Sequence, residues 1–302
     1  MKKVKIVEVG LRDGLQNESV FLTVQERFNV LNKIIESGLN KIEVGSFVSA
    51  KWVPQMAGTD QLVQLFNQKY SLQRQKNITA SVLVPNEFGM SDAVKNQVKE
   101  VAVFISSSET FSQKNINCTI SESLKRVEQV ILLAKKNKIK VRGYLSVCFG
   151  CPYEGKVSES KVVQLAKKLY QMGCYEVSIG DTIGIAYPEQ VSRLFKKLVK
   201  VISRQKCAGH FHDTRGLAIA NIWAAYQQGV KIFDSSLGGL GGCPYAKGAS
   251  GNVSTEDVVN LFHQSGVATG VDLKKLVSAS HELEKYMKKS LNSRISKING
   301  KL

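Results

Sequence analysis

Two histidines late in the chain have the spacing that most favours metal chemistry. His210 and His212 lie in the sequence GHFHD, residues 209–213, which reads as a β-strand and its end. Side chains two residues apart on a strand project to the same face, so both imidazoles point one way and Phe211 the other. Two imidazoles with a carboxylate within reach suit a divalent cation. The alternative is a polar layer bonded to neighbouring side chains. Because two of only four histidines stand here, we favour metal ligation.

Charged residues at two early strands form a second candidate group. Arg12 and Asp13 follow an apolar run that ends at Val9, and Glu43 interrupts another apolar run. Taken alone, Asp13 before a glycine is ordinary turn chemistry and Arg12 is an ordinary surface residue. With the histidine pair on a later strand, a functional interpretation becomes the stronger one. Glu43 needs a partner if it is buried, and we expect Arg12 or the metal to provide it.

A glycine-rich segment, residues 238–251, contains six glycines and Cys243. Glycines allow the backbone to adopt positive φ and to approach a ligand closely. One interpretation is a plain connector at the rim of a domain. The other is a loop that closes over substrate, in which the Cys243 thiol donates or accepts a proton. Glu256 follows in a sequence typical of the first turn of a helix, and we assign it a supporting role only.

Short β-rich runs alternate with helical patterns along the whole chain, which is typical of βαβ units and a parallel sheet. Eight strands in this length favour an α/β fold of the closed (β/α)8 TIM-barrel type, with its chemistry at the C-terminal ends of the strands. An open sheet with a dinucleotide site would need a GxGxxG motif after the first strand, and residues 10–14 (GLRDG) do not match it. The predicted strands are Val4–Val9, Lys41–Gly45, Ile78–Val84, Glu100–Ser106, Lys140–Val147, Glu176–Ile179, Ala208–His212 and Lys231–Ser235.

The helices between these strands have recognisable start and stop signals. Ser158 is placed to cap a helix that Gly173 ends, and Pro188 occupies the first turn of the next. We predict a catalytic barrel over residues 1–271. Residues 272–302 read as a C-terminal helix and basic tail that pack on the barrel as a short helical appendage.

Composition narrows the class of protein further. At 302 residues, with 43% hydrophobic and 22% charged residues, the chain is ordinary globular material. No apolar run approaches the roughly 18 residues of a membrane helix. The six cysteines, including the lone pair Cys148 and Cys151, read as reduced thiols in a chain that starts directly with a strand. We therefore expect a cytoplasmic protein with no membrane partner.

The net charge of +17 permits nucleic-acid binding, an affinity for anionic metabolites or a solvated surface. The lysines occur as pairs within helical segments, for example Lys135 with Lys136 and Lys167 with Lys168. This pattern indicates outward helix faces, and no nucleic-acid-binding motif accompanies them. We favour surface solvation, with attraction of a polyanionic substrate as a secondary benefit, and expect no nucleic-acid partner.

Seven segments together resemble the 3-hydroxy-3-methylglutaryl-CoA lyase family. The resemblance runs from the first strand to beyond Gly266, and the GGCPY sequence around Cys243 is its specific part. The Arg-Asp and His-x-His parts are shared by a wider superfamily of metal-dependent lyases and synthases. The segments are RDGLQNE (12–18), EVGSFVS (43–49), KWVPQM (51–56), CPYEG (151–155), GDTIG (180–184), HFHDT (210–214) and GLGGCPYAKGASGN (239–252).

The resemblance implies a TIM barrel that cleaves 3-hydroxy-3-methylglutaryl-CoA, an acyl-CoA substrate, to acetyl-CoA and acetoacetate. It implies four ligands for Mg²⁺ or Mn²⁺, namely Asp13, His210, His212 and Asn252. Arg12 would bind the substrate carbonyl, and Cys243 would be the active-site thiol. Asp13 and His210 are both candidates for the base that starts the cleavage, and a homodimer is expected.

One departure and three alternatives remain open. Arg215 stands where the family is expected to have a tyrosine, which puts a basic residue near the site. An acyl-CoA-dependent synthase or a pyruvate-forming aldolase of the same superfamily would share the metal ligands. Those synthases usually carry extra C-terminal sequence and lack the cysteine segment. A basic nucleic-acid-binding protein is the remaining and more distant alternative.

Overall fold

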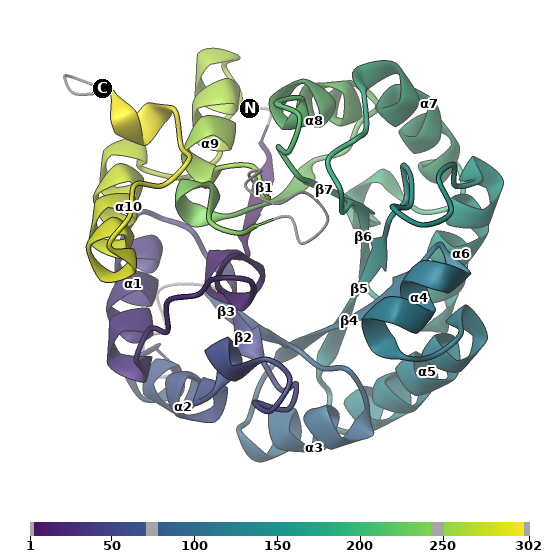
Figure 1. Ribbon diagram of the computed structural model, residues 1–302, viewed down its shortest axis with the longest axis horizontal. Coiled ribbons are helices and arrows are strands. Elements are labelled where there is room, and N and C mark those ends of the chain that lie inside the picture. Colours follow the sequence, from purple (N-terminus) through teal and green to yellow (C-terminus); the bar gives the residue numbers. More distant parts are fainter. Residues whose placement is uncertain (1–2, 71–77, 243–250, 299–302) are drawn as a thin grey trace.

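The computed structural model describes residues 3–70, 78–242 and 251–298 and shows a closed barrel of parallel strands with helices outside (Figure 1). The strands follow one another in sequence order, and β1 pairs with β8 to close the barrel. The predicted (β/α)8 fold and all eight predicted strands are therefore confirmed. The strands are β1 Lys5–Glu8, β2 Lys41–Ser46, β3 Thr79–Leu83, β4 Glu100–Ser106, β5 Lys140–Ser146, β6 Glu176–Asp181, β7 Cys207–Phe211 and β8 Ile232–Ser235.

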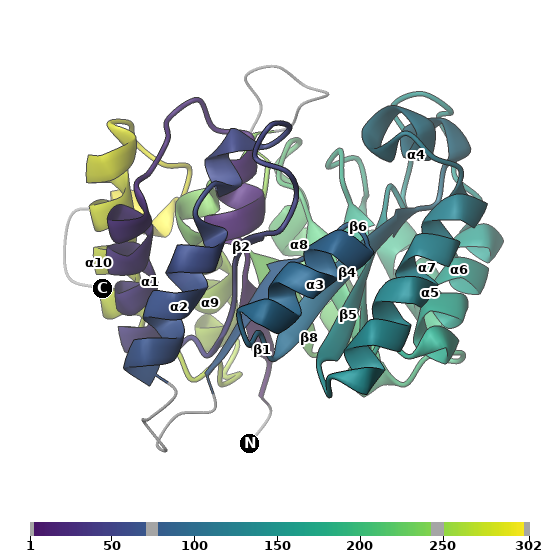
Figure 2. The same ribbon diagram turned by 90° about the horizontal axis from the view of Figure 1, so that it is seen from below.

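The helices cover the outside of the barrel, and α4 lies at the opposite end of the barrel from the N terminus (Figure 2). Their inward faces are aliphatic, such as Val127, Ile131 and Ala134 on α5. The helices are α1 Val24–Glu36, α2 Thr59–Tyr70, α3 Glu87–Lys95, α4 Glu109–Ile116, α5 Ile120–Lys136, α6 Glu159–Met172, α7 Pro188–Leu198, α8 Ala218–Gln227, α9 Thr255–Gln264 and α10 Leu273–Met287. The described residues also form short helical turns, which are η1 Gly10–Gly14, η2 Pro54–Met56, η3 Arg204–Lys206, η4 Leu237–Gly239 and η5 Ile295–Lys297.

The helix boundaries agree with the sequence signals, with one correction. Gly173 ends α6 with a φ of +124°, and Pro188 is the first residue of α7. Ser158 does occupy the N-cap position of α6, but its hydroxyl caps no backbone N–H group. It lies 2.7 Å from the hydroxyl of Ser160 instead. The prediction of a side-chain cap at this helix was therefore wrong, because a neighbouring serine takes the bond.

The interior of the barrel is charged at its N-terminal end, in contrast to the apolar layer between strands and helices. Lys5 pairs with Glu176 at 3.0 Å, and Lys41 with Glu100 at 3.0 Å. Arg142 donates from Nε to Glu176 at 2.6 Å. Burial lowers the pKa of Lys41 to about 8, and the two neighbouring carboxylates offset this effect only in part. The ion pairs join strands that lie far apart in the sequence.

After α10 the chain returns to the rim of the barrel at the C-terminal ends of the strands. The backbone N–H groups of Asn292 and Ser293 both donate to the carbonyl of Gly238, at 2.8 and 3.0 Å. The carboxylate of Asp257 accepts from the backbone of Arg294 and Ile295. This C-terminal strap, residues 288–298, thus fastens η4, the turn that follows β8. The boundary at residue 271 between barrel and appendage stays a prediction.

Candidate active site

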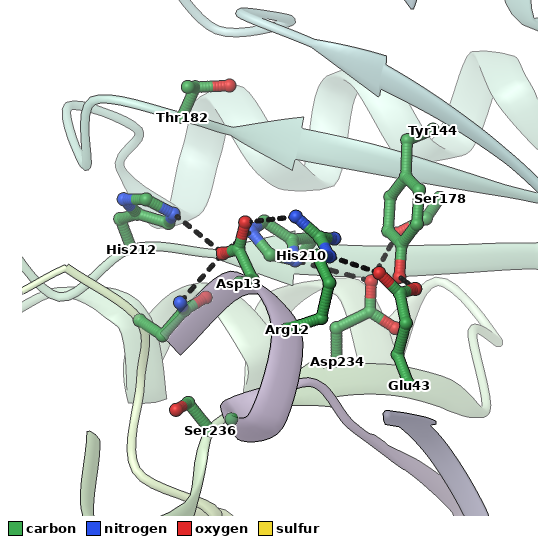
Figure 3. Close-up of polar contacts among 12 residues, drawn as sticks. Arg12, Asp13, Glu43, Tyr144, Ser178, Thr182, His210, His212, Asp234 and Ser236 are labelled. Atoms are coloured by element: carbon green, nitrogen blue, oxygen red, sulfur yellow. Dashed lines mark hydrogen bonds and ion pairs between the residues drawn. The ribbon is translucent and has the colours of Figure 1, made fainter. Parts of the chain in front are cut away.

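A π-helical turn, η1, follows β1 directly and carries Arg12 and Asp13. The carbonyl of Val9 accepts from the backbone N–H groups of Arg12, Asp13 and Gly14 at 3.1, 2.8 and 3.2 Å. Such turns are rare and occur frequently at functional sites. The turn places the two side chains at the C-terminal mouth of the barrel, where they meet residues from β2, β7 and the chain after β8 (Figure 3).

Glu8, the last residue of β1, is the buried group that fixes this turn. One of its carboxylate oxygens accepts from the backbone N–H groups of Gly10 and Leu237, both at 2.8 Å. The other lies 2.6 Å from the hydroxyl of Thr255, which also lies 2.9 Å from the hydroxyl of Ser235. Burial raises the pKa of Glu8 to about 7, although these hydrogen bonds favour the anion. A single carboxyl group therefore links η1, η4 and the start of α9.

Replacing Glu8 with glutamine is expected to stabilise the fold above pH 7 relative to the native chain. The folded pKa of Glu8 is raised from 4.5 to about 7, so folding favours its protonated form. Between these pH values the native chain loses stability as pH rises, by about 3 kcal/mol in all. A neutral amide accepts from the two N–H groups and donates to Thr255 at every pH.

Urea unfolding of metal-free protein at pH 5 and pH 8 measures this effect. The advantage of the Glu8→Gln variant should be larger at pH 8 than at pH 5. An equal pH dependence of stability in the two proteins would show that Glu8 does not change its protonation on folding.

Arg12 is held by carboxylates on both sides. Its Nε donates to Glu43 and its Nη1 donates to Asp13. The hydroxyl of Tyr144 donates to the second oxygen of Glu43 at 2.8 Å, and the guanidinium carbon of Arg12 lies 5.5 Å from the centre of the Tyr144 ring. Of the two partners expected for Glu43, arginine is the one observed. The guanidinium is therefore oriented before any substrate arrives.

Asp13 and the two histidines form a cluster of metal-ligating atoms. One ligand atom from each of Asp13, His210 and His212 lies within 4.8 Å of the others. Oδ2 of Asp13 is 3.8 Å from Nε2 of His210 and 4.0 Å from Nε2 of His212. The predicted projection of both imidazoles toward one side is what brings them to this carboxylate (Figure 3).

Asn252 reaches the same cluster from the segment after β8. Its Nδ2 donates to Oδ2 of Asp13 at 2.8 Å, and its backbone pairs with that of His212 in an isolated antiparallel bridge. The neighbouring Gly251 carbonyl accepts from the N–H group of Asp213 at 2.6 Å. As arranged, the amide nitrogen rather than the amide oxygen faces Asp13. A role as ligand therefore requires the amide of Asn252 to turn over.

The charges of the cluster suit a cation. Burial would raise the pKa of Asp13, but Arg12 and the histidines hold it well below its usual range. Burial and the neighbouring His210 lower the pKa of His212 to about 4, so this imidazole is neutral at pH 7. For His210, burial lowers the pKa, but Asp234 and Asp13 outweigh it and raise the pKa overall. An anionic carboxylate thus faces at least one neutral imidazole.

The donor set fits a divalent metal ion by its chemistry. A carboxylate oxygen from η1 meets two imidazole nitrogens, one from β7 and one from the residue after its end, with an amide beside them. Two histidines and one carboxylate with further positions open are a recurrent arrangement for divalent transition metals, and carboxylate and amide oxygens also suit Mg²⁺ and Mn²⁺. The site therefore fits a divalent cation such as Mg²⁺ or Mn²⁺.

One predicted residue, Glu256, lies apart from this cluster. Glu256 is buried in the first turn of α9 and accepts from the backbone N–H group of Gly238 at 3.0 Å and from Ser254 at 2.8 Å. Ser280 on α10 donates to it as well. Glu256 therefore supports the turn after β8 and is not part of the cluster. Cys243 lies outside the described residues.

Sequence reasoning missed several buried polar residues of the barrel interior that approach His210 or hold the residues that do so. Tyr144, Ser178 and Asp234 lie within β5, β6 and β8, and Arg142 lies beside them. Their signal was weak because each of these strands holds more than one polar residue, and nothing local shows which of them meet inside the barrel. The alternation of Arg142 and Tyr144 along β5 was the one available hint, since it places both side chains inside the barrel.

Among the residues that the structure describes, no helix is long and apolar enough to span a bilayer. The protein-family model described as HMGL-like matches residues 3–283. The 3-hydroxy-3-isohexenylglutaryl-CoA/hydroxy-methylglutaryl-CoA lyase of Pseudomonas aeruginosa is 47% identical to this chain, over 98% of this chain and 97% of its own.

Solved structures agree with the sequence comparison. The crystal structure of hydroxymethylglutaryl-CoA lyase from Pseudomonas aeruginosa superposes with a TM-score of 0.93 at 47% identity, covering 98% of this chain and 97% of that one. A second structure, of an HMG-CoA lyase from Acinetobacter baumannii in complex with coenzyme A and 3-methylmalate, has a TM-score of 0.91 at 34% identity. That match covers 98% of this chain and 94% of the other.

Proposed function

Because the chain belongs to the HMGL-like family, we propose that it is a hydroxymethylglutaryl-CoA lyase, which cleaves 3-hydroxy-3-methylglutaryl-CoA to acetyl-CoA and acetoacetate. The observation that carries the proposal is the meeting of Arg12 and Asp13 with His210 and His212 at the mouth of the barrel. The enzyme is a carbon–carbon lyase. Its acyl-CoA substrate agrees with the coenzyme A bound to the Acinetobacter relative.

Asp13, His210 and His212 are the residues that would hold a divalent cation, either Mg²⁺ or Mn²⁺, and Asn252 would join them after its amide turns. A cation bound there polarises the oxygens of the substrate and makes its tertiary hydroxyl more acidic. Arg12 lies beside Asp13 and is therefore within reach of the same substrate oxygens.

The residues of the chain account for the proton transfers. Asp13 or His210 removes the proton of the tertiary hydroxyl, which then becomes the ketone of acetoacetate. The electrons of the broken carbon–carbon bond pass to the methylene carbon next to the thioester and give an enolate. Arg12 stabilises the enolate oxygen by charge-assisted hydrogen bonding. Cys243 then protonates the enolate carbon to give acetyl-CoA, and the thiolate recovers the proton taken by the base.

The test is acetoacetate release from 3-hydroxy-3-methylglutaryl-CoA by the native chain and by the Cys243→Ala variant, with Mg²⁺ and with EDTA. The native chain is expected to turn over only with the metal, and the variant to lose on the order of a hundredfold or more in kcat. Cys118→Ala is the matched control, since that buried thiol lies in the connection between α4 and α5, far from β7 in sequence.

No turnover by folded, metal-loaded protein would overturn the proposal. Release of free coenzyme A from acetyl-CoA and a 2-oxo acid would indicate the related synthase, and formation of pyruvate from a hydroxy acid would indicate the aldolase. Salt-sensitive DNA binding without activity would favour the nucleic-acid alternative. The homodimer and the cytoplasmic location remain proposals.

A further inference from the structure

Asp234 is a buried carboxylate of β8 that stands directly behind His210. Its Oδ2 lies 3.3 Å from Nδ1 of His210, on the side of the imidazole opposite Asp13. His210 has no other close partner for this nitrogen within the described part of the chain. The two groups do not form a hydrogen bond as arranged, so their contact is a close approach of the carboxylate to the imidazole edge.

Three hydrogen bonds fix the carboxylate of Asp234 itself. Arg142 donates to both of its oxygens, from Nη2 at 2.7 Å and from Nη1 at 3.2 Å. The hydroxyl of Ser178 donates to Oδ2 at 2.7 Å, the same oxygen that approaches His210. Arg142 is held in turn by Glu176 at 2.6 Å. A row of charged side chains therefore crosses the barrel interior from β6 through β5 and β8 to β7.

This row bears on which nitrogen of His210 faces the metal position. An anionic carboxylate held 3.3 Å from Nδ1 favours the neutral tautomer that carries its proton on Nδ1, which leaves the lone pair on Nε2. Nε2 is the atom that points to Asp13. Carboxylates placed behind metal-binding histidines fix the orientation of the ring and raise its strength as a ligand. His212 has no equivalent, because its Nδ1 is buried without a partner among the described residues.

We propose that Asp234 is a positioning residue: held by Arg142 and Ser178, it orients His210 so that Nε2 serves as the metal ligand. The inference rests on the proposed metal site. It makes the two histidines unequal, with His210 the pre-oriented ligand and His212 the one that the metal itself must order. A neutral imidazole has a single free lone pair, so His210 would have none left to act as the base and Asp13 would take that role.

The experiment compares Mn²⁺ binding by the full-length native chain and three variants, using electron paramagnetic resonance to count free Mn²⁺. Asp234→Asn is expected to weaken binding about 10- to 100-fold, the range seen when such supporting groups are lost. Ser178→Ala keeps the charge of Asp234 but removes one of the hydrogen bonds that fix its carboxylate. We therefore expect a smaller loss of Mn²⁺ affinity, of about threefold or more. Glu176→Gln is the matched control. It removes the charge of another buried carboxylate that binds Arg142, but this carboxylate does not face His210.

The visible absorption spectrum of the Co²⁺-loaded proteins gives a second readout. The spectrum should differ from that of the native protein in Asp234→Asn and Ser178→Ala and be unchanged in Glu176→Gln. If these substitutions only destabilised the fold, the melting temperature of the metal-free protein would fall and the Co²⁺ spectrum would not change. Equal affinity in native and Asp234→Asn protein, or an equal loss in Glu176→Gln, would overturn the inference. If Asp234→Asn does not fold, native affinity and spectrum in Ser178→Ala overturn it. A native chain that binds no Mn²⁺ would instead remove the proposed metal site, and the inference with it.

Discussion

Replacing Arg12 with lysine is expected to lower kcat about a hundredfold or more and to leave Mn²⁺ binding within a fewfold of the native value. Arginine donates from two edges at once, from Nε to Glu43 and from Nη1 to Asp13. Lysine keeps the charge but cannot make this planar fork. Within the described part of the chain Nη2 has no hydrogen-bond partner, so it is the edge available to an enolate oxygen.

The loss arises in the transition state because the enolate charge develops only there. A pre-oriented donor stabilises that charge without reorganisation, and removal of one such donor typically costs 10²- to 10³-fold in kcat. Steady-state kinetics of acetoacetate release separate kcat from KM. Arg126→Lys, an exposed change on α5, is the control and should match the native enzyme. An Arg12→Lys enzyme with kcat within tenfold of native would contradict the assignment of Arg12 to the enolate.

Replacing Asp13 with asparagine is expected to weaken Mn²⁺ binding by at least about a hundredfold and to abolish metal-dependent turnover. Asp13 is the one anion among the four proposed ligands, and its pKa lies well below the usual range, so it is charged at every working pH. The substitution preserves shape but removes the charge that offsets the cation. A loss beyond the 10- to 100-fold typical of supporting groups is expected for a direct ligand.

Isothermal titration with Mn²⁺, on protein first treated with EDTA, measures the affinity. Asp92→Asn, an exposed change on α3, controls for the loss of one negative charge. Native affinity in the Asp13→Asn variant would place the cation elsewhere. Because Asp13 also pairs with Arg12, the variant should be checked for the melting temperature of its metal-free form.

The barrel could be predicted because its signals are local. Each strand is a short β-rich run and each helix has its own periodicity, so neither requires knowledge of distant residues. The pairing of His210 with His212 was predictable for the same reason, since two residues on one strand share a face. The meeting of Asp13 with these histidines followed from the rule that barrel chemistry gathers at one end of the strands.

The remainder of the site depends on contacts between distant strands. Arg142 and Asp234 are 92 positions apart and find each other only because the barrel is closed. Nothing local distinguishes the aspartate of β8 from any other polar residue in a strand. Asn252 turns its amide nitrogen toward Asp13, and the hydroxyl of Ser158 bonds to that of Ser160 instead of capping its helix. In both cases the alternative hydrogen bonds are nearly equal in energy, and sequence patterns do not rank them.

The C-terminal strap also has a bearing on the order in which the site is built. The carbonyl of Gly238, at the start of the glycine-rich segment, is bonded by the N–H groups of Asn292 and Ser293. The chain must therefore leave the ribosome as far as residue 293 before η4, the turn after β8, can form these two hydrogen bonds. Every strand of the barrel is made earlier. The nascent protein can thus close its sheet and bring Arg12, Asp13 and the histidines together before the strap secures this rim of the barrel.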